Sequence, residues 1–92
     1  YEKALEEAYR MEGLQELLDK KYPAAIDLLK KSLQINPRDC TTLLWAAQAY
    51  HNTNNKDEAT KYYCRVLSLC PKNEDAKKGL EILGTGCGGN GK

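Results

Sequence analysis

The fold is decided by residues 40–71, which read CTTLLWAAQAYHNTNNKDEATKYYCRVLSLCP. Two blocks rich in Leu, Ala and Tyr at helical spacing flank a turn-forming cluster at 52–55. Thr41 and Thr42 are suitable N-caps for the first block, and Pro71 ends the second because proline cannot continue the helical hydrogen-bond ladder. Since no segment alternates apolar and polar residues, we expect a helical hairpin without strands.

The same layout occurs 34 residues earlier in the chain. Small, large and proline positions coincide between the two copies, in the pairs Gly13 and Ala47, Ala25 and Ala59, Leu29 and Tyr63, Leu33 and Leu67, Ile35 and Leu69, and Pro37 and Pro71. Such repetition indicates a packing unit that stacks on its neighbour, because one unit alone cannot bury its apolar face.

The second copy resembles the tetratricopeptide (TPR) repeat. Seven of its residues stand at the spacing of that family's signature: Leu43, Ala47, Tyr50, Ala59, Tyr63, Val66 and Pro71. The first copy is similar from Ala25 to Pro37, and its leading helix matches at Tyr9 and Gly13. The resemblance implies an all-α fold of five helices, in which antiparallel helical hairpins stack as a short right-handed superhelix.

The domain organisation follows from this alignment. We expect a TPR-like domain over residues 1–83, with repeat one at about 6–39, repeat two at about 40–73 and a capping helix at about 73–83. Ala76, Leu80 and Leu83 form a narrow apolar stripe on that last helix, while Lys77 stands where a third repeat would have a large apolar residue. A polar outer face suits a terminal helix. Residues 84–92 are expected to form a Gly-rich flexible tail.

The resemblance also implies a concave groove lined by the first helix of each unit and by the capping helix. Carried over by position, the groove residues are Arg10, Leu14, Leu17, Thr41, Leu44, Trp45, Gln48, His51 and Lys78, with Asp75 and Ile82 beside Lys78. Trp45 has two interpretations, a contact for a partner or a core side chain, and both stay open. The clamp with which some members bind acidic chaperone tails is incomplete, because Leu14 and Trp45 replace its Asn residues.

These features favour a protein-interaction module, scaffold or adaptor that binds a peptide or helix of a partner protein in the groove. The alternative is a homotypic assembly or structural module that associates through the ends of the stack. We expect no catalysis, because His51 is the sole histidine and its repeat position places it in an open groove without a nucleophile beside it.

The charge balance argues against nucleic-acid partners. Lys and Arg number 14 against 13 Asp and Glu, a formal net charge of +1, and no basic stripe is visible. RNA binding by helical-hairpin repeats is disfavoured for the same reason. Apolar runs such as 43–47 are far shorter than the roughly 20 residues that a membrane span needs, so we expect no membrane partner either.

The four cysteines, Cys40, Cys64, Cys70 and Cys87, contain no CxxC pair, so no metal site is expected. Reduced thiols and a cytoplasmic location are the expectation, with a Cys40–Cys70 bridge as the one pairing considered. Residues 86–92 fit the pattern GxxxxGK, yet a phosphate-binding loop also needs a preceding strand and a Ser or Thr after the Lys. We therefore expect no nucleotide and no other cofactor.

Overall fold

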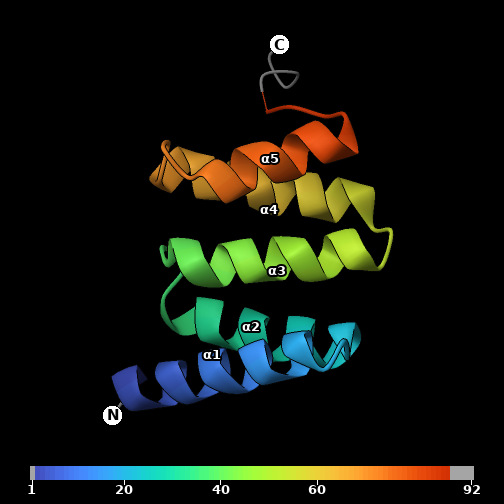
Figure 1. Ribbon diagram of the computed structural model, residues 1–92. Coiled ribbons are helices and arrows are strands. Elements are labelled where there is room, and N and C mark those ends of the chain that lie inside the picture. The colour runs from blue at the N-terminus through green and yellow to red at the C-terminus, as the bar shows by residue number, and fades with distance from the viewer. Residues whose placement is uncertain (1, 88–92) are drawn as a thin grey trace.

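A computed structural model describes residues 2–87 as five α-helices: α1 (Glu2–Leu18), α2 (Tyr22–Ile35), α3 (Cys40–Asn52), α4 (Lys56–Leu69) and α5 (Glu74–Leu83). No strand occurs among these residues. α1 packs on α2 and α3 on α4, while α5 lies against α4 and closes the stack (Figure 1). The all-α stack of helical hairpins that the sequence predicts is confirmed.

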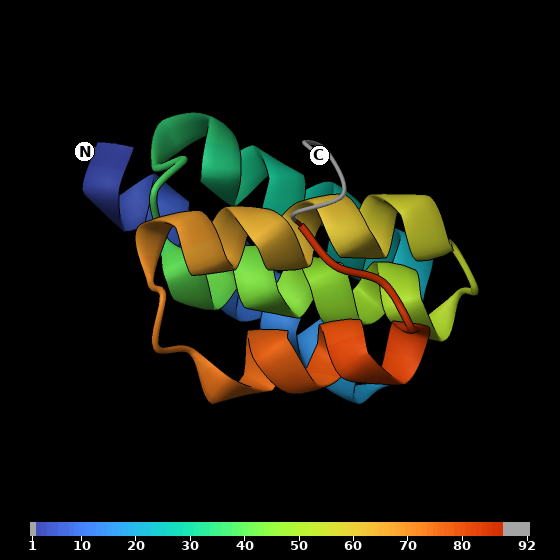
Figure 2. The ribbon, with the colours of Figure 1, turned by 90° about the horizontal axis from the view of Figure 1, so that it is seen from above.

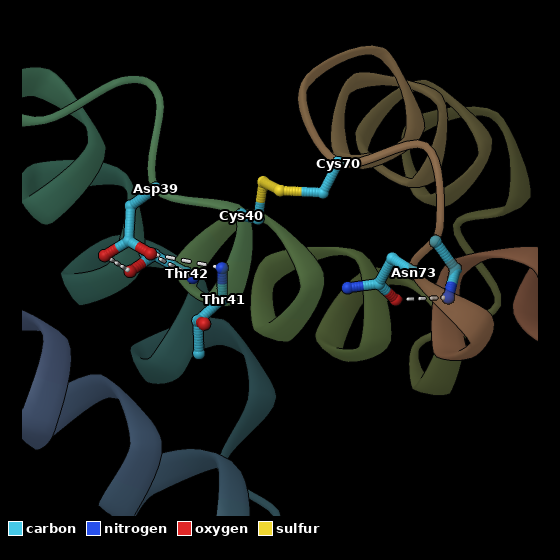
Figure 3. The surroundings of a disulfide bond; sticks show 7 residues. Asp39, Cys40, Thr41, Thr42, Cys70 and Asn73 are labelled. Carbon is cyan, nitrogen blue, oxygen red and sulfur yellow. Dashed lines mark hydrogen bonds between the residues drawn. A yellow bond between two sulfur atoms is a disulfide. The ribbon is translucent and has the colours of Figure 1, made fainter.

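α3 begins at a different cap from the one that the sequence suggested. The carboxylate of Asp39 accepts hydrogen bonds from the backbone N–H groups of Thr41 and Thr42, at 3.1 and 3.4 Å (Figure 3). Asp39 is thus the N-cap, and the Thr42 hydroxyl donates to the same carboxylate at 2.9 Å. The prediction of a Thr cap was wrong, because the carboxylate of Asp39, two residues before Thr41, accepts hydrogen bonds from the free N–H groups of the first turn.

Small residues set the distances between the helices. Ala46, Ala47 and Ala49 of α3 are fully buried, and α3 contacts each of the other four helices. A methyl group on Gly13 of α1 would come within 2.7 Å of Leu29 Cδ2 on α2. The axes of these helices can therefore lie close together only because no larger side chain separates them.

α5 packs closely against α4 at a glycine, Gly79. A methyl group on Gly79 would collide with the ring of Tyr63, whose side chain extends from α4 beneath α5. Ala76, Gly79 and Leu80 form the buried side of α5, while Lys77 and Glu81 are exposed. One side of α5 thus packs on the stack and the other is polar, as in a terminal helix.

All four cysteines form disulfide bonds, which corrects the expectation of reduced thiols. Cys40–Cys70 joins the first residue of α3 to the residue that follows α4, and so closes the open end of this hairpin (Figure 3). Disulfides persist in oxidising environments and are rare in the cytosol. The cytoplasmic location stays a prediction, without the reduced thiols from which it was inferred.

The segment that follows α5 runs back over α4 (Figure 2). Gly84 makes the reversal possible, since its φ of 72° lies in the left-handed region that favours glycine. The Thr85 hydroxyl lies 3.0 Å from the Thr60 hydroxyl, and Cys87 is bonded to Cys64 of α4. The first part of the expected tail is thus held on α4, whereas residues 88–92, with most of the GxxxxGK pattern, lie outside the described residues.

Replacement of Gly79 tests the close packing of α5 against Tyr63 of α4. Gly79→Ala should lower the free energy of unfolding by about 1–3 kcal/mol, because the added methyl group must displace the buried Tyr63 ring. Gly86→Ala is the matched control: nothing lies within 4 Å of an added methyl group there, so a change within about 0.5 kcal/mol is expected. Urea unfolding followed by circular dichroism measures both, and equal stability of the two variants would contradict the proposed contact.

The two disulfides should be detectable in solution. Thiol titration of the unfolded chain without reductant should find no free thiol, and titration after reduction should find four. Cys40→Ser/Cys70→Ser and Cys64→Ser/Cys87→Ser should each lower the free energy of unfolding by about 2–4 kcal/mol, since each bridge restricts the unfolded chain. Free thiols in the purified, unreduced chain would show that the pairing is wrong.

Candidate functional site

A groove of about 420 Å³ is lined by the C-terminal halves of α1 and α3 and by α5 along its length; we call it the α1/α3/α5 groove. Side chains from α2 and α4 reach into it as well. Its walls are formed by Leu17, Leu18, Tyr22, Gln48, His51, Asn52, Tyr63, Asp75, Lys78, Gly79 and Ile82.

The rim of the groove carries two large apolar side chains that the fold leaves in solvent. Leu18, the last residue of α1, is 66% exposed, and Ile82 of α5 is 68% exposed. Neither side chain contributes much to the core at this exposure, so folding alone does not account for an apolar residue at either place. Exposed apolar side chains grouped at a groove are typical of interaction sites.

The floor of the groove is a buried tyrosine that contacts the sole histidine. The Tyr63 hydroxyl lies 3.2 Å from His51 Nδ1, and the two rings meet edge to face with centroids 6.1 Å apart. Burial raises the pKa of Tyr63, and the negative charge of Asp75 raises it further. The phenol therefore stays neutral at physiological pH and fixes the orientation of His51.

The structure brings together part of the predicted site. Leu17, Gln48, His51 and Lys78 line the groove, as do Asp75 and Ile82 beside Lys78. These residues come from the three helices that the resemblance assigned to the groove. Their spacing by whole helical turns places them on one side of each helix.

The other predicted residues lie elsewhere. Leu14 and Thr41 do not line the groove. Leu44 is 8% exposed and belongs to the core, and Trp45 is partly buried against the same core. Of the two interpretations of Trp45, the structure therefore favours the core side chain over a contact for a partner.

Arg10 forms ion pairs within the fold. Its guanidinium lies 3.7 Å from Glu6, 3.9 Å from Glu7 and 3.5 Å from Asp39. Glu6 is itself 7% exposed and accepts a 2.9 Å hydrogen bond from the Ser32 hydroxyl. This network joins α1 to α2 and to the cap of α3, so the charge of Arg10 is already balanced by carboxylates of the chain.

Five lining residues were absent from the sequence-based set: Leu18, Tyr22, Asn52, Tyr63 and Gly79. Tyr22 and Tyr63 belong to second helices, whereas the resemblance assigned only first helices and the capping helix to the groove. Gly79 carried a usable signal, because a glycine inside a helix often marks a close approach of another side chain. Here that side chain is Tyr63.

The described residues contain no group of three or more His, Cys, Asp or Glu side chains arranged to hold a metal ion. Within the same part of the chain, every helix is too short or too polar to cross a membrane.

Titration of the tyrosines tests the floor of the groove. The folded chain holds the proton of Tyr63 more tightly than the unfolded chain, whose tyrosine pKa is about 10, so stability from this group is lost as the pH rises above about 10. Absorbance titration should show a phenol that ionises above the usual range for tyrosine. This step should be missing from Tyr63→Phe and retained in Tyr22→Phe; the reverse result would contradict the buried position of Tyr63.

Comparison with known proteins identifies the repeat. The family model of the tetratricopeptide repeat matches residues 16–80, which cover most of the chain, from the last residues of α1 through α2, α3 and α4 into α5. No curated protein shows significant similarity to the chain. Repeats of this family generally mediate protein–protein interaction and are typically non-catalytic. The chain therefore belongs to the tetratricopeptide repeat family.

Proposed function

We propose that this protein is a non-catalytic interaction module that binds a peptide or helix of a partner protein in the α1/α3/α5 groove. The observation that carries the proposal is the pair of exposed apolar side chains, Leu18 and Ile82, on opposite walls of this groove. Apolar side chains of a partner could displace water from both walls at once, and such desolvated contacts supply most of the energy of binding at protein interfaces.

The polar residues between these walls would select the partner. His51 and Gln48 on α3 and Lys78 on α5 offer hydrogen-bonding groups along the groove, and Asp75 adds a negative charge. A segment with apolar side chains on one side and backbone or polar groups beside them fits this arrangement. An amphipathic helix or a short extended peptide has this character.

The same geometry supports the absence of catalysis. Proton transfer by His51 would need a reacting group placed next to a free ring nitrogen. Nδ1 of His51 lies 3.2 Å from the Tyr63 hydroxyl, which leaves only Nε2 for proton transfer, and the groove lining contains no Ser or Cys that could act as a nucleophile beside it. The groove is thus better suited to hold a polypeptide than to transform one.

Exchange of the two apolar residues tests the proposal. Leu18→Asp/Ile82→Asp should weaken the retention of a partner from cell lysate at least tenfold, because loss of two anchoring side chains costs roughly 2 kcal/mol or more. Both side chains are exposed, so the variant should keep the helicity of the native chain. The matched control is Leu5→Asp/Met11→Asp, which changes two exposed apolar side chains of α1 away from the groove and should retain the partner.

Two results would contradict the proposal. Equal retention by the native chain and the groove variant would show that the partner binds elsewhere. Recovery of this chain alone, with self-association that survives in the groove variant, would favour the alternative of a homotypic assembly through the ends of the stack.

A further inference from the structure

The face formed by α2 and α4 carries a second, chemically different groove. One hollow of about 360 Å³ is lined by Lys30, Leu33 and Gln34 of α2 and by Tyr62 and Arg65 of α4. A second hollow, of about 240 Å³, follows toward the C-terminal ends of these helices. Arg65 borders both hollows, so they are adjacent, and we call the two together the α2/α4 groove.

Three cations line the α2/α4 groove. Lys30 and Arg65 border its first hollow, and Arg38 joins Arg65 at the second. No carboxylate lines either hollow. A positive potential along a groove with low-dielectric walls attracts negatively charged ligands.

The charges of these three side chains are not balanced by the fold. Among residues 3–87, no carboxylate lies within 4.0 Å of the charged groups of Lys30, Arg38 or Arg65, whereas Arg10 has three such partners. Glu58 is near enough for its charge to act on Lys30, but its carboxylate pairs with Lys61 at 3.6 Å. Hydrogen bonding to Tyr50 raises the pKa of Lys30, so this side chain stays protonated.

Two of the cations rest on tyrosine rings. The Arg65 guanidinium lies 5.2 Å from the centroid of the Tyr62 ring, and Lys30 Nζ lies 5.8 Å from that of Tyr50. The two rings are packed on each other at 5.3 Å and are largely buried. Contact with fixed aromatic rings restricts both long side chains before any ligand binds, which lowers the entropic cost of binding.

From these observations we infer that the α2/α4 groove binds an acidic peptide segment of a partner protein. Carboxylates of such a segment would pair with Lys30, Arg65 and Arg38, while the partly exposed Leu69 offers an apolar contact in the same hollow as Arg38 and Arg65. A peptide is favoured over a nucleic acid because the groove is lined by only three cations, too few for a surface that must neutralise many phosphates. This inference is independent of the α1/α3/α5 groove.

A fluorescein-labelled decaglutamate peptide is the probe, with binding measured by fluorescence polarisation at low salt. Lys30→Ala/Arg38→Ala/Arg65→Ala should weaken its binding about tenfold or more, because three charge-assisted contacts are lost. The matched control, Lys3→Ala/Lys72→Ala/Lys77→Ala, removes the same charge from exposed positions outside the groove and should change binding less than twofold. Circular dichroism confirms that both variants stay folded.

Two further arms of the experiment distinguish the α2/α4 groove from the α1/α3/α5 groove and a peptide site from a nucleic-acid site. Leu18→Ala/Ile82→Ala should bind decaglutamate as tightly as the native chain, since it alters only the α1/α3/α5 groove. An unlabelled decathymidylate strand should compete at least tenfold more weakly than unlabelled decaglutamate. Four results would each overturn the inference. The native chain could fail to bind decaglutamate, or the two triple variants could weaken binding equally. Leu18→Ala/Ile82→Ala could abolish binding, or the oligonucleotide could compete as well as unlabelled decaglutamate.

Discussion

The packing of α3 against all four other helices is the constraint on which the rest of the structure depends. This helix contacts all four others, and Leu43, Ala46, Ala47 and Ala49 have no exposed surface. A helix can pack against four neighbours at once only if they approach closely, which requires small residues at the contacts. Alanine on α3 meets that requirement, while Gly13 on α1 and Gly79 on α5 allow the same close approach to α2 and α4. The positions of the other helices, and hence of both grooves, follow from it.

Much of this fold could be predicted from the sequence, because it depends on patterns that repeat. The shift of 34 residues that aligns Ala25 with Ala59 predicted the hairpins, and the two prolines predicted the ends of the second helices. The disulfide between Cys64 and Cys87 could not be predicted in this way. It depends on the reversal at Gly84, which carries a segment outside the repeat back onto α4. The cap of α3 was also missed, since Asp39 and Thr42 both suit that role and only geometry distinguishes them.

The residues of the candidate site could be predicted only where their position in the repeat places them in the groove. Gln48 and His51 line the α1/α3/α5 groove because α3 occupies the position that the resemblance gave it. Arg10 does not line this groove, because its guanidinium pairs with the carboxylates of Glu6 and Asp39, which lie far apart in the sequence. Whether a cation is free to bind a ligand depends on its neighbours in space, and spacing along one helix does not reveal them. The cations of the α2/α4 groove were overlooked because the total charge of the chain is nearly balanced. That balance does not show how the charges are distributed over the surface.

One turn of α4 connects the two grooves. Consecutive residues of a helix point about 100° apart, so Tyr62 and Tyr63 serve different faces of the stack. Tyr62 supports Arg65 in the α2/α4 groove, and Tyr63 forms the floor of the α1/α3/α5 groove beneath His51. The next residue, Cys64, ties the same turn to the segment after α5. A rotation of α4 would therefore move Tyr62 and Tyr63 together and would be resisted by the Cys64–Cys87 disulfide. The disulfide thus helps to keep the two grooves in a fixed position relative to each other.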